Sequence, residues 1–181
     1  MDACRVHAQS KAAAATLSRR LARIFAAHKD VVVVCIGTPA VPGDAFGPMV
    51  GSALRRSLPI PVYGTLHHPV AALELPTIRR MLRAKHRNAT VIAVDAALGY
   101  PRTVQFIKIV KGGIQPGRGL GRRWGSIGDY AIQGIVSPRT KDPLRALEQT
   151  PHRLVKSMAN VTSTAIVSAW RRTHRRRSRK R

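Results

Sequence analysis

Apolar positions recur along this chain of 181 residues in two patterns, one typical of helices and one of buried strands. Residues 9–28 carry apolar side chains at helical spacing, such as Leu17 and Leu21, with Arg and Lys on the other faces. Residues 31–37, VVVVCIG, form an unbroken apolar run. Such a run is typical of a parallel strand buried on both faces under helices.

The rest of the chain repeats this order of strand and helix. We predict strands over residues 61–66, 89–99, 102–110 and 129–137, and helices over residues 45–58, 69–88 and 150–170. The segment 102–110 alternates polar and apolar residues, which favours an antiparallel or edge strand. Strands that alternate with helices predict a single α/β domain over residues 1–170, a three-layer α/β/α sandwich with a mixed, mostly parallel sheet. Residues 171–181 contain almost only cations, and we predict a disordered basic tail.

Composition excludes several classes of protein. Cys4 and Cys35 are too few for a disulfide framework and do not have the spacing of a metal-binding pair, which fits a reducing cytoplasm. No apolar stretch approaches the ~20 residues that a membrane span needs. We therefore expect a cytoplasmic protein without a membrane partner, and the sequence does not specify its oligomeric state.

The net charge of +24 is extreme, and eight of the cations lie in the last eleven residues. A surface this positive attracts polyanions through its long-range field and through counterion release. We expect nonspecific contact with nucleic acid through a group of arginines in the tail. These are Arg171, Arg172, Arg175, Arg176 and Arg177. A tail that is only solvated explains the same composition, and both interpretations stay open.

Two of the eight acidic residues stand where α/β proteins form ligand clefts. Asp44 lies on the Gly/Pro-rich loop behind the first strand, and Asp95 ends the apolar run VIAVD. Such clefts form beyond the carboxyl ends of parallel strands. Two carboxyl groups in contact share one proton, because ionising both places two negative charges side by side, which is unfavourable in free energy. A pair of this kind can polarise a water molecule and protonate a leaving amine, which is hydrolysis of an amide.

Structural interpretations of the same residues stay open. Asp44 is a natural helix N-cap, and Asp95 can accept hydrogen bonds from the turn that follows it. The two carboxylates can also bind a divalent cation, with Asp129 as a further weak candidate ligand. His67 and His68 are adjacent on an extended segment, so only one of them can face a given cleft. We expect no cofactor, with the divalent metal as the alternative.

Five segments, taken in this order, resemble the YyaC family of bacterial sporulation proteins, which are known as spore proteases. They are VVVVCIGTPAVPGDAFGPMVGSAL, VYGTLHHPVAAL, VIAVDAALG, GGIQPGRGLGR and IGDYAIQGIVS. The resemblance covers roughly residues 31–170. It implies kinship with germination protease, which degrades small acid-soluble spore proteins, and more distantly with the hydrogenase maturation endopeptidases. It also implies the phosphorylase/hydrolase-like α/β/α fold.

The resemblance assigns expected roles to single residues. The Asp-Ala-x-Gly-Pro motif of germination protease matches residues 44–48, and its strand ending in Asp-Ala matches Asp95 and Ala96. Those two aspartates are the proposed catalytic pair of the family. Its Ile-x-Pro-Gly-x-Gly segment matches residues 114–119. We accordingly expect substrate contacts from Gly43, His67, Gly117, Arg118 and Gly119.

Three departures from the family pattern qualify these roles. The chain has only the core of the longer germination protease, and His67 stands where an acidic residue is expected. Hydrogenase maturation proteases place two acids and a later His around the metal of their client protein. No His lies between Asp95 and His152 in this chain, which weighs against a metal site.

Added to the position of the two acids, the resemblance implies a sporulation-linked endopeptidase in which Asp44 and Asp95 hydrolyse peptide bonds. Its partner is a protein or peptide substrate, with small acid-soluble spore proteins as candidates, in the forespore or mother cell of a spore-forming bacterium. The alternative is a non-catalytic spore protein of the same fold that binds DNA or another polyanion through its basic surface.

Overall fold

β2 (Val31–Cys35) is an interior strand of the sheet, second from one edge, and every one of its five residues is buried. The computed structural model describes residues 4–116 and 125–178. On its two sides β2 pairs in parallel with β3 (Val62–Tyr63) and with β4 (Thr90–Gly99). An all-apolar strand needs cover on both faces, and parallel neighbours in the middle of a sheet provide the setting for it.

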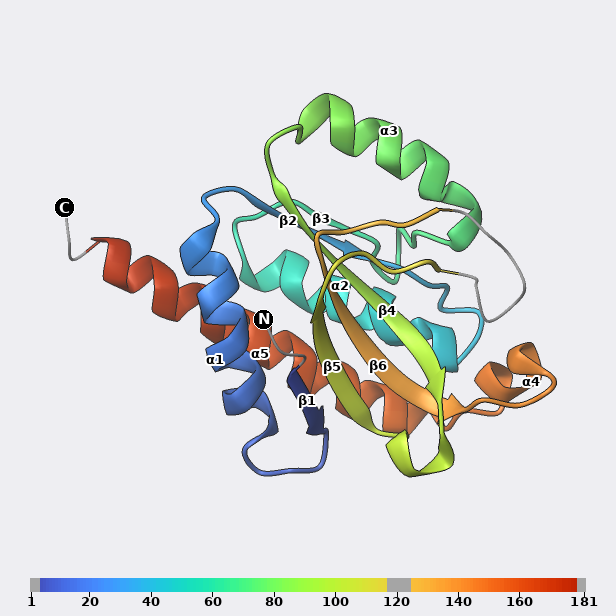
Figure 1. Cartoon of the computed structure of the whole chain (residues 1–181). Coiled ribbons are helices and arrows are strands. Elements are labelled where there is room, and N and C mark those ends of the chain that lie inside the picture. The colour runs from blue at the N-terminus through green and yellow to red at the C-terminus, as the bar shows by residue number, and fades with distance from the viewer. Residues whose placement is uncertain (1–3, 117–124, 179–181) are drawn as a thin grey trace.

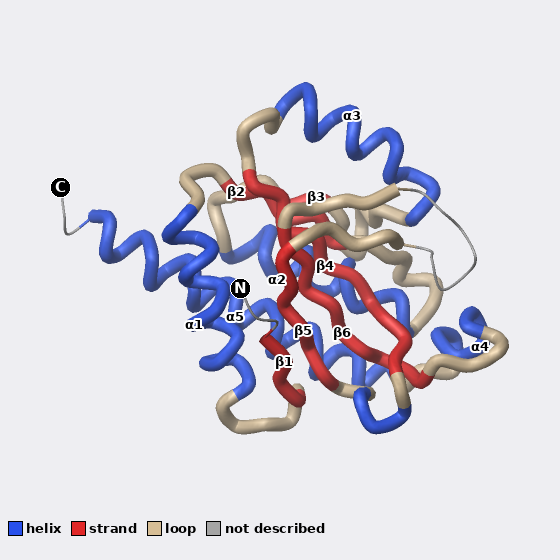
Figure 2. The backbone as a smooth tube through the Cα atoms, viewed as in Figure 1, coloured by secondary structure: helices blue, strands red, loops and turns tan. Residues whose placement is uncertain are grey.

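The described sheet has six strands in the order β1-β5-β6-β4-β2-β3 (Figure 2). β6 (Tyr130–Pro138) is parallel to β4, whereas β5 (Phe106–Lys111) is antiparallel to β6. The predicted mixed, mostly parallel sheet is confirmed, as is the antiparallel strand expected over residues 102–110. That strand is not at the edge, because β1 (Cys4–His7), which the sequence analysis missed, pairs with its outer side.

Helices cover both faces of the sheet and complete the three layers (Figure 1). One face carries α1 (Ala13–Ala27), α2 (Phe46–Ser57) and α5 (His152–Ser178), which share one apolar core with alternate residues of the strands. The other face carries α3 (Leu75–Lys85) and a second, smaller apolar cluster. The predicted α/β/α sandwich is therefore confirmed.

Several short helices had no signal that the sequence analysis recognised. They are α4 (Pro143–Glu148) and the 3-10 helices Gly43–Ala45, Ala72–Glu74 and Pro101–Thr103. The carboxylate of Asp142 caps α4 by accepting a hydrogen bond from the Arg145 amide at 3.0 Å. Within the described residues, none of the helices combines the length and the apolar character that crossing a bilayer demands.

The predicted disorder after residue 170 is wrong as far as Ser178, because α5 continues to that residue. Trp170 packs edge-on against Phe25 of α1 with ring centroids 5.5 Å apart, and Thr173 is buried against the same helix. These contacts anchor the helix one turn into the basic segment, and arginine is a good helix former beyond them. Residues 179–181 lie outside the described part of the chain.

Candidate active site

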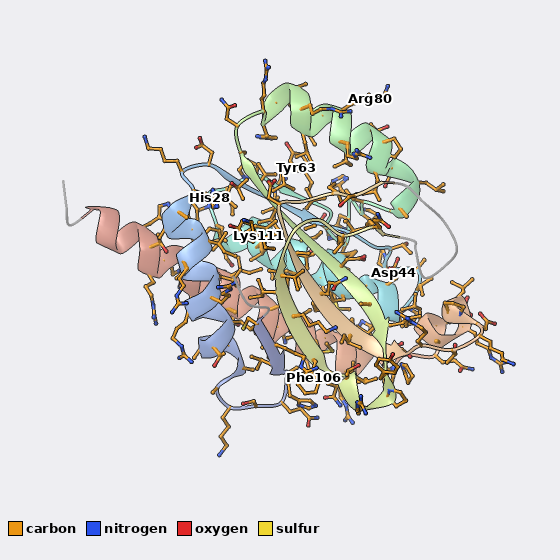
Figure 3. All side chains as sticks on the ribbon, in the orientation of Figure 1. His28, Asp44, Tyr63, Arg80, Phe106 and Lys111 are labelled. Carbon is orange, nitrogen blue, oxygen red and sulfur yellow. The ribbon has the colours of Figure 1, made fainter. Side chains whose placement is uncertain are left out.

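Asp44 is held at the carboxyl end of β2 by a loop that folds back on itself. Gly37 has a φ of +133°, and a methyl group on it would overlap the carbonyl oxygen of Asp44. Only glycine fits this position. The Thr38 amide then donates a hydrogen bond of 2.7 Å to the Asp44 carboxylate. Figure 3 shows Asp44 beside the start of α2. The loop therefore fixes the carboxylate by main-chain contacts.

Asp95 lies in the middle of β4, at the point where its neighbour β2 ends. The last residue of β2, Cys35, is level with Val94, and the Ile36 amide donates to the Val94 carbonyl at 2.7 Å. β4 itself continues to Gly99, so Asp95 ends the apolar run but not the strand. The half-exposed state of Asp95 therefore comes from the end of the adjacent strand and not from the end of its own.

The two aspartates are close enough to influence each other's ionisation. Burial raises the pKa of Asp95 well above its ordinary value, and the charge of Asp44 raises it further. A hydrogen bond from the Ala96 amide acts in the opposite direction. Burial also raises the pKa of Asp44, which the Thr38 amide partly offsets. The pKa of Asp95 is therefore raised more than that of Asp44, so Asp44 ionises first as pH rises and Asp95 keeps its proton longer.

Asp129, the third candidate acid, does not join this pair. Its carboxylate accepts a hydrogen bond of 2.8 Å from the Val91 amide. Val91 precedes Asp95 by four residues, or about 13 Å along an extended strand. Among the described residues, no three His, Cys, Asp or Glu side chains lie together in a group suited to a metal ion. Asp129 instead joins the start of β4 to the start of β6.

The predicted substrate-binding residues are scattered or outside the described part. His67 is exposed in the turn that the Thr65 side chain stabilises by accepting from the His68 amide at 3.0 Å. Gly43 is buried, and a methyl group on it would meet Leu147. Its position is thus explained by packing against α4. Gly117, Arg118 and Gly119 lie outside the described residues, so their substrate contacts stay a prediction.

Two polar residues near the pair were missed by the sequence analysis. Gln133 of β6 is level with Asp95, and Lys108 of β5 is level with Gln133. Residues level in a sheet share a face, so these three side chains form one row, and each is half-buried. Both residues interrupt apolar strands, in YAIQGIVS and FIKIV, which was the available signal.

The row lies on the α3 face of the sheet, beyond the part that α3 covers. Ala93 and Ala131, two residues before Asp95 and Gln133, belong to the apolar cluster under α3. In Figure 1 the lower halves of β4, β5 and β6 face the viewer with no labelled helix in front of them. In that view no described helix crosses this part of the sheet, beside the carboxyl pair.

The candidate nucleic-acid residues lie on the last turns of α5. Arg171 and Arg172 are exposed, and Arg175, Arg176 and Arg177 continue the helix. The side chains of these last three lie outside the described part of the structure. Contact between this segment and nucleic acid stays a prediction.

The raised pKa of Asp95 predicts how stability depends on pH. Between about pH 4, where a carboxyl group of the unfolded chain ionises, and the higher folded pKa, only the unfolded chain loses its proton. The wild type therefore loses stability as pH rises through this window, and the loss is complete above the folded pKa. Asn cannot ionise, so we expect Asp95→Asn to melt at a higher temperature than the wild type at pH 7.

Melting curves between pH 4 and pH 8 test this expectation. Each unit of difference between the two pKa values is worth about 1.4 kcal/mol, or roughly 3–6 °C in a domain of this size. The gap between wild type and Asp95→Asn should close as pH falls toward 4. Glu148→Gln, at an exposed site, is the matched control. Melting temperatures for wild type and Asp95→Asn that stay parallel over the whole range would contradict the shift.

Comparison with known proteins gives a family and a fold. A family model described as "Protein of unknown function (DUF1256)" matches residues 5–165. "Uncharacterized protein YyaC" of Bacillus subtilis (strain 168) is 38% identical over 143 residues, which are 78% of this chain and 70% of that protein. The crystal structure of a NiFe hydrogenase maturation protease, HycI from Thermococcus kodakarensis KOD1, is similar with a TM-score of 0.59. It is 17% identical and covers 84% of this chain and 99% of its own, so this likeness shows the fold alone.

Proposed function

Because this chain belongs to the DUF1256 family and folds like a hydrogenase maturation protease, we propose that it is an endopeptidase that uses Asp44 and Asp95. The fold by itself does not give an activity, since one fold serves many functions. What supports the proposal is the pair of carboxyl groups at the end of β2. The match of residues 44–48 to the germination-protease motif supports a role in sporulation.

One observation carries the catalytic part of the proposal: the charge of Asp44 helps to raise the pKa of Asp95. Two aspartates with only a structural role would make the fold more stable if they lay farther apart, because the ionisation of one opposes that of the other. Here the chain keeps both half-buried, with a main-chain amide donating to each of them. Strongly perturbed carboxyl groups beside an open surface are typical of acid–base sites.

The proposed mechanism divides the work between the two residues. Ionised Asp44 accepts a proton from a water molecule as the water oxygen attacks the peptide carbonyl carbon. Protonated Asp95 gives its proton to the amide nitrogen as the carbon–nitrogen bond breaks. The products are a carboxylic acid and an amine. Proton transfer by positioned groups of this kind typically contributes 10²–10⁴-fold to a rate.

The open part of the sheet is the proposed substrate site. A peptide in extended form can lie across the row of Asp95, Gln133 and Lys108, where no described helix covers the sheet. The Gln133 side-chain amide, adjacent to Asp95, is suited to donate a hydrogen bond to a substrate carbonyl. We propose protein or peptide substrates, with small acid-soluble spore proteins as the class that the sequence resemblance suggests.

The Gly-rich connection between β5 and β6 is the proposed border of this site. Ile114 and Ile127 pair across it in an antiparallel bridge, and both are buried in the cluster under α3. The Ile114 amide donates to the Ile127 carbonyl at 3.0 Å, and the reverse bond is 2.9 Å. The two arms of the connection are thereby fixed to the rest of the domain, and the segment 117–124 between them lies outside the described residues.

A search for cleaved products tests the proposed function. The purified protein is incubated between pH 4 and pH 8 with small acid-soluble spore proteins and with a peptide library, and new N-termini are identified by mass spectrometry. We expect cleavage by the wild type and none by the Asp44→Asn/Asp95→Asn double variant. Products that are the same for both proteins, at every pH, would end the proposal.

A second arm of the experiment distinguishes the aspartate pair from metal-assisted hydrolysis. Two carboxylates can bind a divalent cation, although the described residues provide no third ligand of the His, Cys, Asp or Glu type beside them. Cleavage by the pair alone is expected to continue in the presence of a chelator. Loss of cleavage that an added cation restores would assign the attacking water to a metal ion.

A further inference from the structure

A pocket of about 520 Å³ opens at the opposite end of β2 from the aspartate pair. Its floor is the start of β2, and its walls come from the segment before β3, the end of α3 and one residue of α5. The lining residues are Lys29, Asp30, Val31, Val32, residues 59–61, residues 84–89 and Trp170. This volume lies within the range of pockets that bind small organic ligands.

Cations dominate the polar part of this pocket. Three solvent-exposed cations line it: Lys29, Lys85 and Arg87. His86 and Asn88, the neighbours of Arg87 in sequence, also line the pocket. Asp30 is the one acid in the lining, and its main-chain carbonyl is occupied by the Thr90 amide at 2.9 Å. A site with this excess of Lys and Arg is suited to an anion with several oxygen atoms.

The remainder of the lining is apolar and held in place. Trp170 is packed edge-on against Phe25, and the His174 ring stacks on it with centroids 3.4 Å apart. The ring of His86, which also lines the pocket, forms a hydrogen bond of 2.8 Å with the hydroxyl of Tyr63. The pocket thus combines a Trp170 ring fixed by its neighbours with exposed cationic side chains, which is a combination suited to a base and its phosphate.

We propose that this pocket binds a nucleotide unit, either as a free nucleotide or within a single-stranded nucleic acid. Lys85, Arg87 and Lys29 hold the phosphate, and the base packs against the Trp170 wall. A base inside a duplex is stacked and cannot enter a pocket of this kind without leaving its neighbours. The site is separate from the aspartate pair, so it does not depend on peptidase activity.

The surroundings of the pocket agree with a single strand that continues past it. Arg171 and Arg172 follow Trp170 directly on α5 and are exposed. Phosphates on either side of the bound nucleotide can meet these cations. Each phosphate that is neutralised adds to the salt dependence of binding, with a slope of about −0.7 per contact for single strands.

Fluorescence of Trp170 provides the test. The chain has two tryptophans, so Trp124→Phe leaves Trp170 as the single reporter. ATP, a single-stranded oligonucleotide and a duplex of the same length are titrated at low salt. If the pocket binds free nucleotides, we expect ATP to quench the Trp170 fluorescence with saturation. If it binds a nucleotide only within a nucleic acid, we expect the single strand and not ATP to do so. No change with either, or equal binding of the duplex, would overturn the proposal.

Matched charge reversals separate the pocket from the general field of a chain with net charge +24. Lys85→Glu/Arg87→Glu changes the pocket, whereas Arg153→Glu/Lys156→Glu makes the same change at exposed positions near the start of α5. We expect affinity to fall at least about 10-fold with the first pair and less than about 3-fold with the second. Equal losses of affinity would show that the ligand is attracted only by the positive electrostatic field of the whole chain, and would refute nucleotide binding in the pocket.

Discussion

The Asp95→Asn protein is expected to fold normally and to cleave peptides at least about 10³-fold more slowly than the wild type. Asn has nearly the shape of a protonated Asp but carries no proton that it can give to the leaving nitrogen, and this step typically contributes 10²–10⁴-fold. Asp44→Asn is expected to lose a similar factor, because it removes the group that accepts the proton from water. The measurement is kcat/KM on the peptide found in the product search.

The pH profile of the wild type distinguishes the two roles. Activity requires Asp44 to be ionised and Asp95 to be protonated, so kcat/KM should fall on both sides of an optimum. The raised pKa of Asp44 places the acid-side loss above the ordinary range of an Asp, and the further raised pKa of Asp95 sets the alkaline limit. The two limits belong to the coupled pair and not to single residues.

A control with one carboxylate removed elsewhere shows whether the loss is specific. Glu148 is exposed on α4, and Glu148→Gln replaces a carboxyl group by an amide, as either Asp→Asn variant does, and removes one negative charge, as Asp44→Asn does. It is expected to retain wild-type turnover. Full activity in both single Asp variants, with circular dichroism unchanged, would remove the proposed mechanism. Equal loss in Glu148→Gln would indicate that charge and not chemistry explains the result.

Gly51→Ala is expected to unfold the domain or to lower its unfolding free energy by more than about 3 kcal/mol. A methyl group at this buried position of α2 would overlap the main-chain carbonyl oxygen of Gly64. The obstacle is backbone on both sides, so no side-chain rotation can relieve it. The change also pushes α2 away from the end of β3, and Asp44 lies at the start of α2, so peptidase activity should disappear in any protein that folds.

Helix propensity makes the sign of this prediction informative. Replacing Gly by Ala inside a helix ordinarily stabilises the helix by up to about 1 kcal/mol. A lower unfolding free energy of Gly51→Ala can therefore come only from the close approach of α2 to the end of β3. Arg56→Ala, at an exposed position of the same helix, is the control and should shift stability by less than about 0.5 kcal/mol. Urea unfolding of the three proteins is the measurement, and a Gly51→Ala protein as stable as the wild type would contradict the packing.

The elements with strong periodicity were predictable from sequence, and those without it were not. The run of four valines indicated β2, and helical spacing indicated α1 and most of α5, because each pattern extends over many residues. The strand β1 is four residues long and pairs with β5, more than 90 positions away, so its formation depends on tertiary contact. The end of α5 was misjudged because its charge suggested disorder, whereas its anchor is a contact between Trp170 and Phe25.

The candidate site divides in the same way. The positions of Asp44 and Asp95 behind buried strands indicated a shared cleft, since the ends of parallel strands meet at one edge of a sheet. That rule does not give the register. The pairing of Asp95 with Gln133 and of Gln133 with Lys108 depends on hydrogen bonds between three strands. The basic pocket brings together four distant segments, and no local pattern marks it.

The sequence by itself therefore determined the layers of the fold and identified the two candidate acids of the site. Both depend on local properties, namely the spacing of apolar residues and the position of each acid behind a buried strand. Only the tertiary structure decided that the charge of one acid raises the pKa of the other, that Asp129 lies elsewhere, and that cations line a pocket beside Trp170. The physical reason is that electrostatic coupling and cavity shape depend on distances through space. Those distances are set by strand order and packing, which the order of residues along the chain does not display.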